Sequence, residues 1–227
     1  MSIKKQLSKI DLIIFDFDGT LFQGKKFSLP IFRKCLKKAY KKFQLDKEYP
    51  SDEVILSQFG KQVEDIYNDI FGSNKIEVIE YFSNCVEIAE VKSFKEGKGE
   101  FFPDVEKTLS ILKKHGYKLA ICTNAPKYYW EEATKIFQLG KFFDLMMAAG
   151  LYPGRDKIWM VHNIVNKLNS KHFMVVGDRH HDIAAAKANN GISVGCSYGY
   201  GAKEVEKADI IISEIKELLS VLSIHIS

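Results

Sequence analysis

Short apolar runs alternate with amphipathic stretches along most of the chain. The apolar runs predict strands, which we place at Leu12 to Asp16, Lys118 to Thr123, Leu145 to Ala149, Phe173 to Gly177, Ile192 to Cys196 and Asp209 to Ile212. Their nearly continuous apolar character is typical of a parallel sheet covered on both faces. Helical periodicity separates most of them, as at Val105, Leu109 and Leu112. The alternation predicts an α/β fold with a doubly wound, Rossmann-like parallel sheet.

Residues 23–96 break this alternation. One amphipathic helix is indicated by Ile31, Phe32, Cys35, Leu36, Ala39, Tyr40 and Phe43, and another by Ile76, Ile79, Phe82, Val86 and Ala89. We therefore expect an all-helical insert at residues 23–96, within an α/β core built from residues 1–22 and 97–227.

Composition excludes some classes of protein. With 227 residues and 46% hydrophobic content the chain can bury a full core, and a net charge of +4 gives no reason to expect a nucleic-acid partner. No apolar run approaches the ~20 residues that a membrane span needs, and we find no secretory signal. The cysteines are far apart and form no CxxC pair, at Cys35, Cys85, Cys122 and Cys196. We therefore expect a cytoplasmic protein in a reducing environment.

Charge is uneven within the insert. Residues 25–47 carry nine Lys and Arg against Asp46 alone, whereas residues 51–90 carry nine acids against Lys61 and Lys75. We interpret this pattern as basic and acidic helices on a solvated bundle. The alternative is steering of an anionic substrate or contact with an acidic partner.

Two carboxylates follow the first predicted strand. In the run IDLIIFDFDGTLF, residues 10–22, Asp16 and Asp18 lie two residues apart and so point the same way along a strand. Gly19 allows a sharp turn whose amides can hold an anion. This combination suits phosphate chemistry assisted by a hard cation.

Polar residues also follow two later strands. Thr123 and Asn124 end the second strand, where the hydroxyl and the Asn124 amide can donate to phosphoryl oxygens. Asp178 ends the fourth strand, and Asp182 lies one helical turn later, so the two can face one cation. Ligands of parallel sheets bind outside the carboxyl ends of the strands, where all of these residues fall.

Together with Lys157, these stretches resemble the haloacid dehalogenase-like hydrolase superfamily. The likeness extends from about residue 10 to residue 219, and the tail GDRHHDIAAAKANNGISVGCSYGYG is most similar to the phosphoglycolate phosphatase-like branch. The resemblance implies that the insert is a helical cap that closes over the site and excludes water.

The resemblance also implies roles for the motif residues. Asp16 is the expected nucleophile, which forms an aspartyl phosphate, and Asp18 the expected general acid and base. Gly19, Thr123, Asn124 and Lys157 are expected to bind phosphate. Mg²⁺ is the expected cofactor, held by Asp16, the Asp18 carbonyl, Asp178 and a phosphate oxygen. Asp182 is expected to orient a water or Lys157.

Two assignments have competitors. Arg155 competes with Lys157 as the phosphate-binding cation, and we prefer Lys157 because the helix beginning at Ile158 puts it at a helix N-terminus. His180 and His181 can be interpreted as ligands of a softer metal. We favour surface histidines at these positions, with His181 near the substrate.

The sequence therefore predicts a cytoplasmic, Mg²⁺-dependent phosphatase for a small phosphomonoester such as phosphoglycolate, a sugar phosphate or a nucleotide. A phosphomutase is the first alternative, and a dehalogenase is weaker because it would not be expected to carry Asp18. A catalytically idle binding or regulatory module is the alternative of a different class. The natural substrate and the oligomeric state stay open.

Overall fold

One six-stranded parallel sheet forms the centre of the molecule. The structure is a computed structural model that describes residues 3–59, 61, 63–71 and 76–224. The strands are β1 (Leu12–Phe15), β2 (Lys118–Thr123), β3 (Leu145–Ala148), β4 (Phe173–Gly177), β5 (Ile192–Cys196) and β6 (Ile210–Ile212). Their order in the sheet is β3-β2-β1-β4-β5-β6, so β1 lies between β2 and β4. The six predicted strands are confirmed, each to within one residue at its ends.

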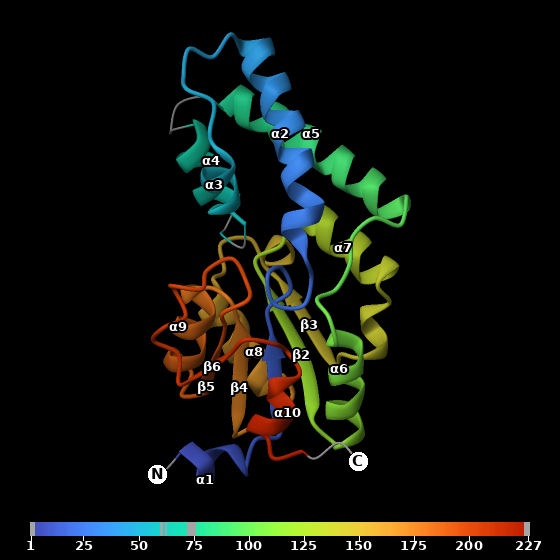
Figure 1. Ribbon diagram of the computed structural model, residues 1–227, viewed down its shortest axis with the longest axis vertical. Coiled ribbons are helices and arrows are strands. Elements are labelled where there is room, and N and C mark those ends of the chain that lie inside the picture. The colour runs from blue at the N-terminus through green and yellow to red at the C-terminus, as the bar shows by residue number, and fades with distance from the viewer. Residues whose placement is uncertain (1–2, 60, 62, 72–75, 225–227) are drawn as a thin grey trace.

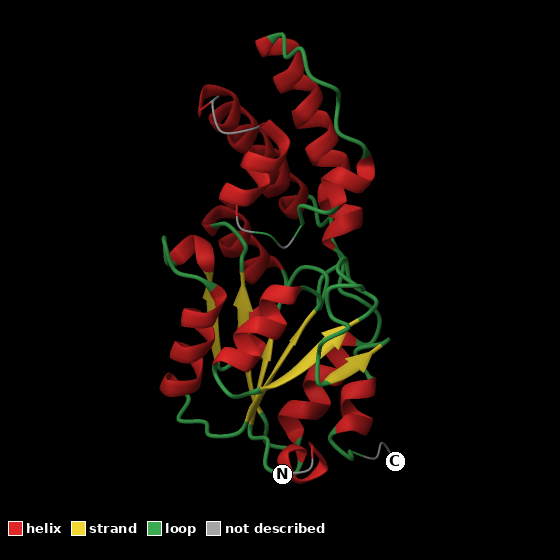
Figure 2. Ribbon diagram, turned by 90° about the vertical axis from the view of Figure 1, so that its left-hand side faces the viewer, coloured by secondary structure: helices red, strands yellow, loops and turns green. Residues whose placement is uncertain are grey.

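Helices cover both faces of the sheet, as Figure 2 shows. The core helices are α1 (Ile3–Leu7), α6 (Val105–Lys114), α7 (Lys127–Ile136), α8 (Lys157–Lys167), α9 (His180–Ala188) and α10 (Glu217–Val221), with 3-10 turns at Leu139–Lys141 and Ala149–Leu151. Successive strand residues serve opposite faces. Leu12 and Ile14 pack with α8 and α9, whereas Ile13 and Phe15 pack with α6, α7 and α10. A doubly wound sheet is thereby confirmed.

The insert consists of helices that stand over the carboxyl ends of the strands (Figure 1). They are α2 (Gly24–Phe43), α3 (Asp52–Leu56), α4 (Val63–Phe71) and α5 (Ile76–Lys95). The long helices α2 and α5 pack against each other. None of the described helices is long and apolar enough to cross a membrane.

The buried face of α5 differs from the predicted one. Its buried residues recur every four positions, at Val78, Phe82, Val86, Glu90 and Phe94. Ile76, which the sequence pattern places on the apolar face, is 72% exposed. The predicted face is confirmed at Phe82 and Val86 and wrong at Ile76, because the buried positions recur every four residues and include Glu90.

The chain crosses between core and insert at two adjacent points. Phe22 and Phe101 form an antiparallel bridge, and the amide of Gln23 donates to the Glu100 carbonyl at 2.9 Å. The amide of Phe102 donates to the Leu21 carbonyl at 2.8 Å. The outgoing and returning segments therefore support each other beside the β1 loop.

Cysteines behave differently in the two regions. Cys35 of α2 and Cys85 of α5 form a disulfide, with their Cα atoms 5.7 Å apart, whereas Cys122 and Cys196 of the core are free and buried. Fifty positions separate the bonded pair in sequence. Sequence spacing gave no sign of this pair because only the packing of α2 on α5 brings the two thiols together.

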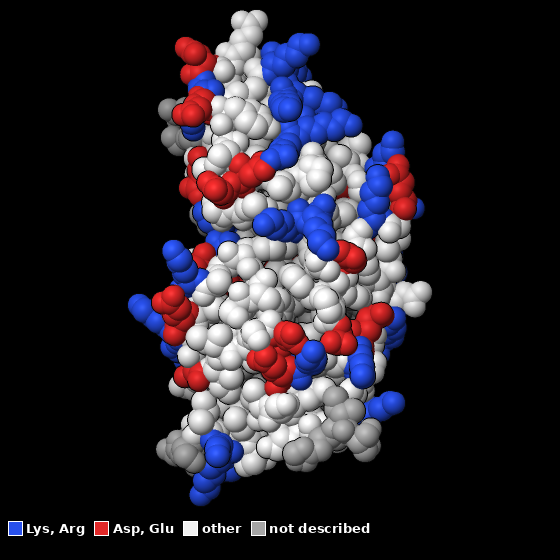
Figure 3. Space-filling model, viewed as in Figure 1, with Lys and Arg blue, Asp and Glu red and all other residues white. Residues whose placement is uncertain are grey.

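The basic residues of α2 lie on its solvent side. Figure 3 shows Lys and Arg gathered over this helix, and its lysines and Arg33 are exposed. Arg33 pairs with Asp52 of α3, and Lys26 pairs with Glu100 at 2.8 Å. This exposure agrees with the interpretation as a solvated bundle. Glu90 is buried, unlike the other described acids of residues 51–90.

Candidate active site

The loop after β1 presents Asp16 at the middle of the sheet edge. Asp16 is 2% exposed, and its amide donates to the Val176 carbonyl at 2.9 Å, which continues the pairing with β4. The loop then turns at Gly19, whose φ is +82°. A Cβ atom on Gly19 would overlap the carboxylate of Asp178. The absence of a side chain at Gly19 thus lets Asp178 lie against the loop that follows Asp16. The amide of Gly19 donates within this loop, to the Phe22 carbonyl at 3.0 Å.

Lys157 joins two of the acids. It is the first residue of α8, whose N-cap Asp156 accepts a hydrogen bond from the Trp159 amide. Its ammonium group lies 3.0 Å from Asp16 Oδ1 and 2.7 Å from Asp182 Oδ1. Burial by itself would lower the pKa of Lys157, but the two carboxylates outweigh it and raise that pKa above its ordinary value. Lys157 therefore stays charged.

Arg155, the competing cation, lies elsewhere. It is exposed, and its guanidinium group lies 5.0 Å from the centre of the Trp159 ring. Of the two candidate cations, Lys157 is thus the one that the structure brings to the carboxylates.

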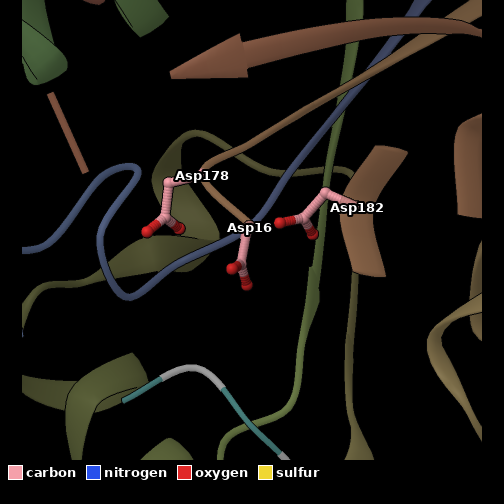
Figure 4. A group of neighbouring side chains, drawn as sticks. All are labelled: Asp16, Asp178 and Asp182. Atoms are coloured by element: carbon pink, nitrogen blue, oxygen red, sulfur yellow. The ribbon is translucent and has the colours of Figure 1, made fainter. Parts of the chain in front are cut away.

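Three buried carboxylates converge at this edge of the sheet, as Figure 4 shows. Asp16, Asp178 and Asp182 each offer an oxygen within 4.8 Å of the others. Asp178 accepts from the Tyr200 amide at 2.7 Å and from the Thr20 hydroxyl at 3.3 Å. Burial raises the pKa of Asp178 well above its ordinary value, and the two neighbouring acids raise it further.

Asp182 has both oxygens in use. Oδ1 accepts from Lys157, and Oδ2 accepts from the Arg179 amide at 3.0 Å. Such an arrangement fits a residue that orients Lys157 from behind the reacting groups.

The donor set fits a hard divalent cation. Burial raises the pKa of Asp16 to about 6, although Lys157 opposes the shift. Clustered carboxylates repel one another in their charged forms, and all their donor atoms are oxygens, which Mg²⁺ prefers. The cluster could therefore hold a metal ion through Asp16 and Asp178.

The histidines lie apart from these donors. His180 is exposed and bonds Glu204 at 2.5 Å, and its ring lies 3.8 Å from that of His181. Burial, then the neighbouring His180, lowers the pKa of the half-buried His181. Among the described residues, the acid cluster includes neither histidine.

Asp18 faces a cavity and has a tyrosine partner. The Tyr129 hydroxyl donates to Asp18 Oδ1 at 2.6 Å. Burial raises the pKa of Asp18 to about 7, despite the opposing hydrogen bond from Tyr129. Asp18 can thus hold and release a proton near neutral pH.

The cavity lies between the strand ends and the helical insert. Thr123 and Asn124 line it from the end of β2, and both are buried. The Thr123 hydroxyl accepts from the Ala125 amide at 3.2 Å. The cavity also reaches Asp16 and Asp18, so these two acids, Thr123 and Asn124 meet at its floor.

Tyr129 and Glu90 also line the cavity, and neither belongs to the predicted site. Tyr129 lies in the first turn of α7, shortly after Thr123. Its place one turn beyond a strand end is the signal in the sequence that points to it. Glu90 lines the cavity from the insert, on the buried stripe of α5, and no sequence pattern indicates it.

Arg179 links core and insert. Its guanidinium group donates to the carbonyls of Phe59 at 2.9 Å and Ser57 at 3.2 Å, and it pairs with Glu204 at 3.0 Å. Nothing in its sequence context shows this role, because Phe59 lies 120 positions away. The residue after Asp178 thereby holds the insert over the cavity.

The chain and its fold both have relatives among known proteins. A family model described as haloacid dehalogenase-like hydrolase matches residues 13–195. The chain is 28% identical to the phosphoglycolate phosphatase of Aliivibrio fischeri over 230 residues, which cover 94% of this chain and 97% of the relative. It is 26% identical to the pyrophosphatase PpaX of Bacillus mycoides over 222 residues, covering 95% and 98%.

A solved structure shares the fold. The crystal structure of a predicted phosphoglycolate phosphatase from Haemophilus somnus matches with a TM-score of 0.75 at 24% identity, over 94% of this chain and 98% of that one. At this identity the likeness shows the fold alone.

Proposed function

Because the chain belongs to the haloacid dehalogenase-like hydrolase family, we propose that it is a Mg²⁺-dependent phosphatase that acts through an aspartyl phosphate. The observation that carries the proposal is the position of Asp16. Its buried carboxylate lies beside Lys157 and within the Asp178 and Asp182 cluster, at the floor of the cavity. The family relatives named phosphoglycolate phosphatase and pyrophosphatase support a small phosphorylated substrate.

Asp16 makes the first bond. One of its carboxylate oxygens attacks phosphorus, and the bond from phosphorus to the leaving alcohol oxygen breaks. Lys157, Thr123 and Asn124 bind the phosphoryl oxygens, with the turn at Gly19 placing Asp178 beside them. Asp16, the Asp18 carbonyl and Asp178 would hold Mg²⁺, which would neutralise charge on the phosphoryl group.

Asp18 moves the proton. In its protonated form it gives the proton to the leaving alcohol oxygen, which departs as a neutral alcohol. The carboxylate then takes a proton from a water that attacks the aspartyl phosphate, and phosphate and free Asp16 result. Tyr129 holds Asp18 in place throughout, since burial and the nearby Asp18 raise the pKa of the tyrosine and keep its hydroxyl protonated.

The helical insert acts as a cap. We assign residues 23–96 to the cap and residues 1–22 and 97–227 to the catalytic core. Seated by Arg179, the cap shields the charged groups at the cavity floor from bulk water, which strengthens their interaction with the phosphoryl group.

The cytoplasmic location is part of the proposal, and the Cys35–Cys85 disulfide weighs against it. Disulfides are rare in reducing compartments. Alkylation of cells at the moment of lysis, followed by mass spectrometry, decides the point. Two alkylated thiols at Cys35 and Cys85 support the cytoplasm, and a protected pair contradicts it.

Hydrolysis of p-nitrophenyl phosphate tests the activity. We expect Mg²⁺-dependent release of phosphate, inhibition by Ca²⁺, and a phosphoryl group on Asp16 after acid quenching. An idle binding module would show none of these. Full activity in excess chelator would contradict the metal assignment.

A further inference from the structure

Above the phosphate-binding floor, the cavity is walled by aromatic rings. Phe32, Phe59, Tyr67 and Phe82 come from the cap, and Tyr128, Tyr129 and Tyr200 come from the core. Aromatic faces carry negative quadrupole density, so they attract cations that are stripped of water. The wall thus favours an apolar or cationic group over an anion.

A buried acid lies in this wall. Glu90 is 3% exposed and lines the cavity from α5. Its carboxyl group accepts from the Ser28 hydroxyl at 2.8 Å and from the Tyr128 hydroxyl at 3.3 Å. Among the described residues no Lys, Arg or His lies within ion-pair distance of Glu90. Burial raises its pKa to about 8, with the two hydroxyl bonds opposing the shift.

Lys61 also lines the cavity, but its ammonium group is already paired with other groups. Lys61 lies 2.7 Å from Asp69 and 3.2 Å from the Gln58 side-chain oxygen. A second negative group on a substrate would therefore face aromatic rings and an acid, and burying a charge without a partner is costly. An acidic leaving group fits this wall poorly.

Glu90 lies within reach of a small molecule bound at the floor. The adjacent residues Tyr128 and Tyr129 bond Glu90 and Asp18 respectively. Both acids line the same cavity, and the nearby Asp18 is one of the groups that raise the pKa of Glu90. One small phosphomonoester can therefore touch both.

We propose that the substrate is the phosphomonoester of an amino alcohol, with its ammonium group held by Glu90 inside the aromatic wall. This inference rests on the proposed phosphatase function and names its substrate class. In the free protein at neutral pH the carboxyl group of Glu90 holds a proton, which the ammonium group replaces on binding. The ammonium group of the substrate thus becomes the cationic partner of Glu90.

A matched set of substrates tests the proposal on the wild-type protein. Phosphocholine carries a trimethylammonium group, and 3,3-dimethylbutyl phosphate has the same shape without the charge. We expect kcat/KM to be about 10- to 100-fold higher for phosphocholine or for 2-aminoethyl phosphate than for their uncharged isosteres. Phosphoglycolate should be the poorest of the set. Equal values for charged and uncharged isosteres, or a preference for phosphoglycolate, would overturn the inference.

Glu90→Gln tests the residue itself. We expect the ratio of kcat/KM between phosphocholine and its uncharged isostere to fall at least about tenfold, because the amide cannot pair with the ammonium group. Glu87→Gln, an exposed position on the same helix, is the control and should keep the wild-type ratio. An unchanged ratio in Glu90→Gln would remove Glu90 from the site.

Binding measurements separate this inference from the proposed function. Calorimetry in excess chelator compares phosphocholine with 3,3-dimethylbutyl phosphate without turnover. A charge preference of at least about tenfold that is lost in Glu90→Gln supports the ammonium site, even if no phosphate is hydrolysed. Hydrolysis of p-nitrophenyl phosphate without that preference in binding or in kcat/KM leaves the phosphatase standing and overturns the ammonium site.

Discussion

Buried charges have different partners in two parts of the cavity. One part is the floor at the strand ends, and the other is the roof, by which we mean the aromatic wall that contains Glu90. At the floor, Asp16 and Asp182 pair with Lys157, and the acid cluster has the composition of a divalent cation site. In the roof, Glu90 has two hydroxyl partners and no cation within ion-pair distance among the described residues. This difference in partners indicates which part of the substrate contacts the floor and which part contacts the roof. The floor holds a group that every phosphomonoester shares, and the roof is left to be completed by the particular substrate.

Asp16→Asn should have the largest effect, because it removes the attacking oxygen from the floor. We expect phosphatase turnover to fall by at least about 10³-fold. Circular dichroism and the thermal midpoint check that the fold is retained, and the roof should still show its charge preference in binding. Turnover within tenfold of wild type would contradict the covalent mechanism.

Asp178→Ala should distinguish a metal held by the acid cluster from one held by the histidines. We expect the Mg²⁺ concentration for half-maximal activity to rise about 100-fold, because the variant loses a carboxylate from the proposed metal site. His181→Ala is the matched comparison and should change it by less than about threefold, since the histidine lies outside the acid cluster. A larger effect at His181 would favour a softer metal at the histidines.

Glu90→Gln should show how much the buried carboxyl group of Glu90 lowers the free energy of unfolding. The unfolded carboxyl group loses its proton near 4.5 and the folded one near 8, so between these values the unfolded state binds fewer protons. Wild-type stability therefore falls as pH rises through this window, by at most about 1.4 kcal/mol per pH unit. We expect the variant to be about 4 kcal/mol more stable than wild type at pH 8, with the difference closing toward pH 4.5.

Urea unfolding at several pH values measures this difference. The groups around Glu90 are Ser28 of α2, Tyr128 of α7 and Asp18 of the β1 loop, and all of them remain in the variant. Glu87→Gln should follow the wild-type curve. Parallel curves for Glu90→Gln and wild type would show that the Glu90 carboxyl ionises alike in the folded and unfolded states.

Tyr129→Phe should have the smallest effect, because it removes a hydroxyl that only positions Asp18. We expect kcat to fall about tenfold for alkyl phosphates and less for aryl phosphates, whose leaving groups need little help from an acid. Steady-state rates on one substrate of each kind measure the ratio. An equal fall for both kinds would indicate that Tyr129 acts on the fold or on binding instead.

The floor could be predicted from the sequence almost residue by residue. Asp16 and Asp178 directly follow apolar runs, and Thr123 ends another. Such runs favour buried strands, and the carboxyl ends of parallel strands lie at one edge of the sheet. The amphipathic helix beginning at Ile158 likewise put Lys157 at a helix start. For these residues the apolar pattern along the sequence is enough to predict their position at the carboxyl edge of the sheet.

The roof could not be predicted in this way. Glu90 interrupts an apolar stripe on α5, and a charged residue on a helix is usually solvated, so no pattern in the sequence indicates that it is buried. Arg179 and the Cys35–Cys85 pair depend on contacts between segments that no short pattern connects.

By itself the sequence determined the order of strands and helices, the acids at the strand ends and the family that they indicate. Hydrophobic periodicity is local, and it specifies a parallel sheet whose carboxyl edge gathers those acids. Only the tertiary structure decided how the cap sits, that the Glu90 carboxyl group is buried without a cation, and which aromatic rings surround it. These features depend on the packing of α5 against α2 and α7, and packing joins residues whatever their separation along the chain.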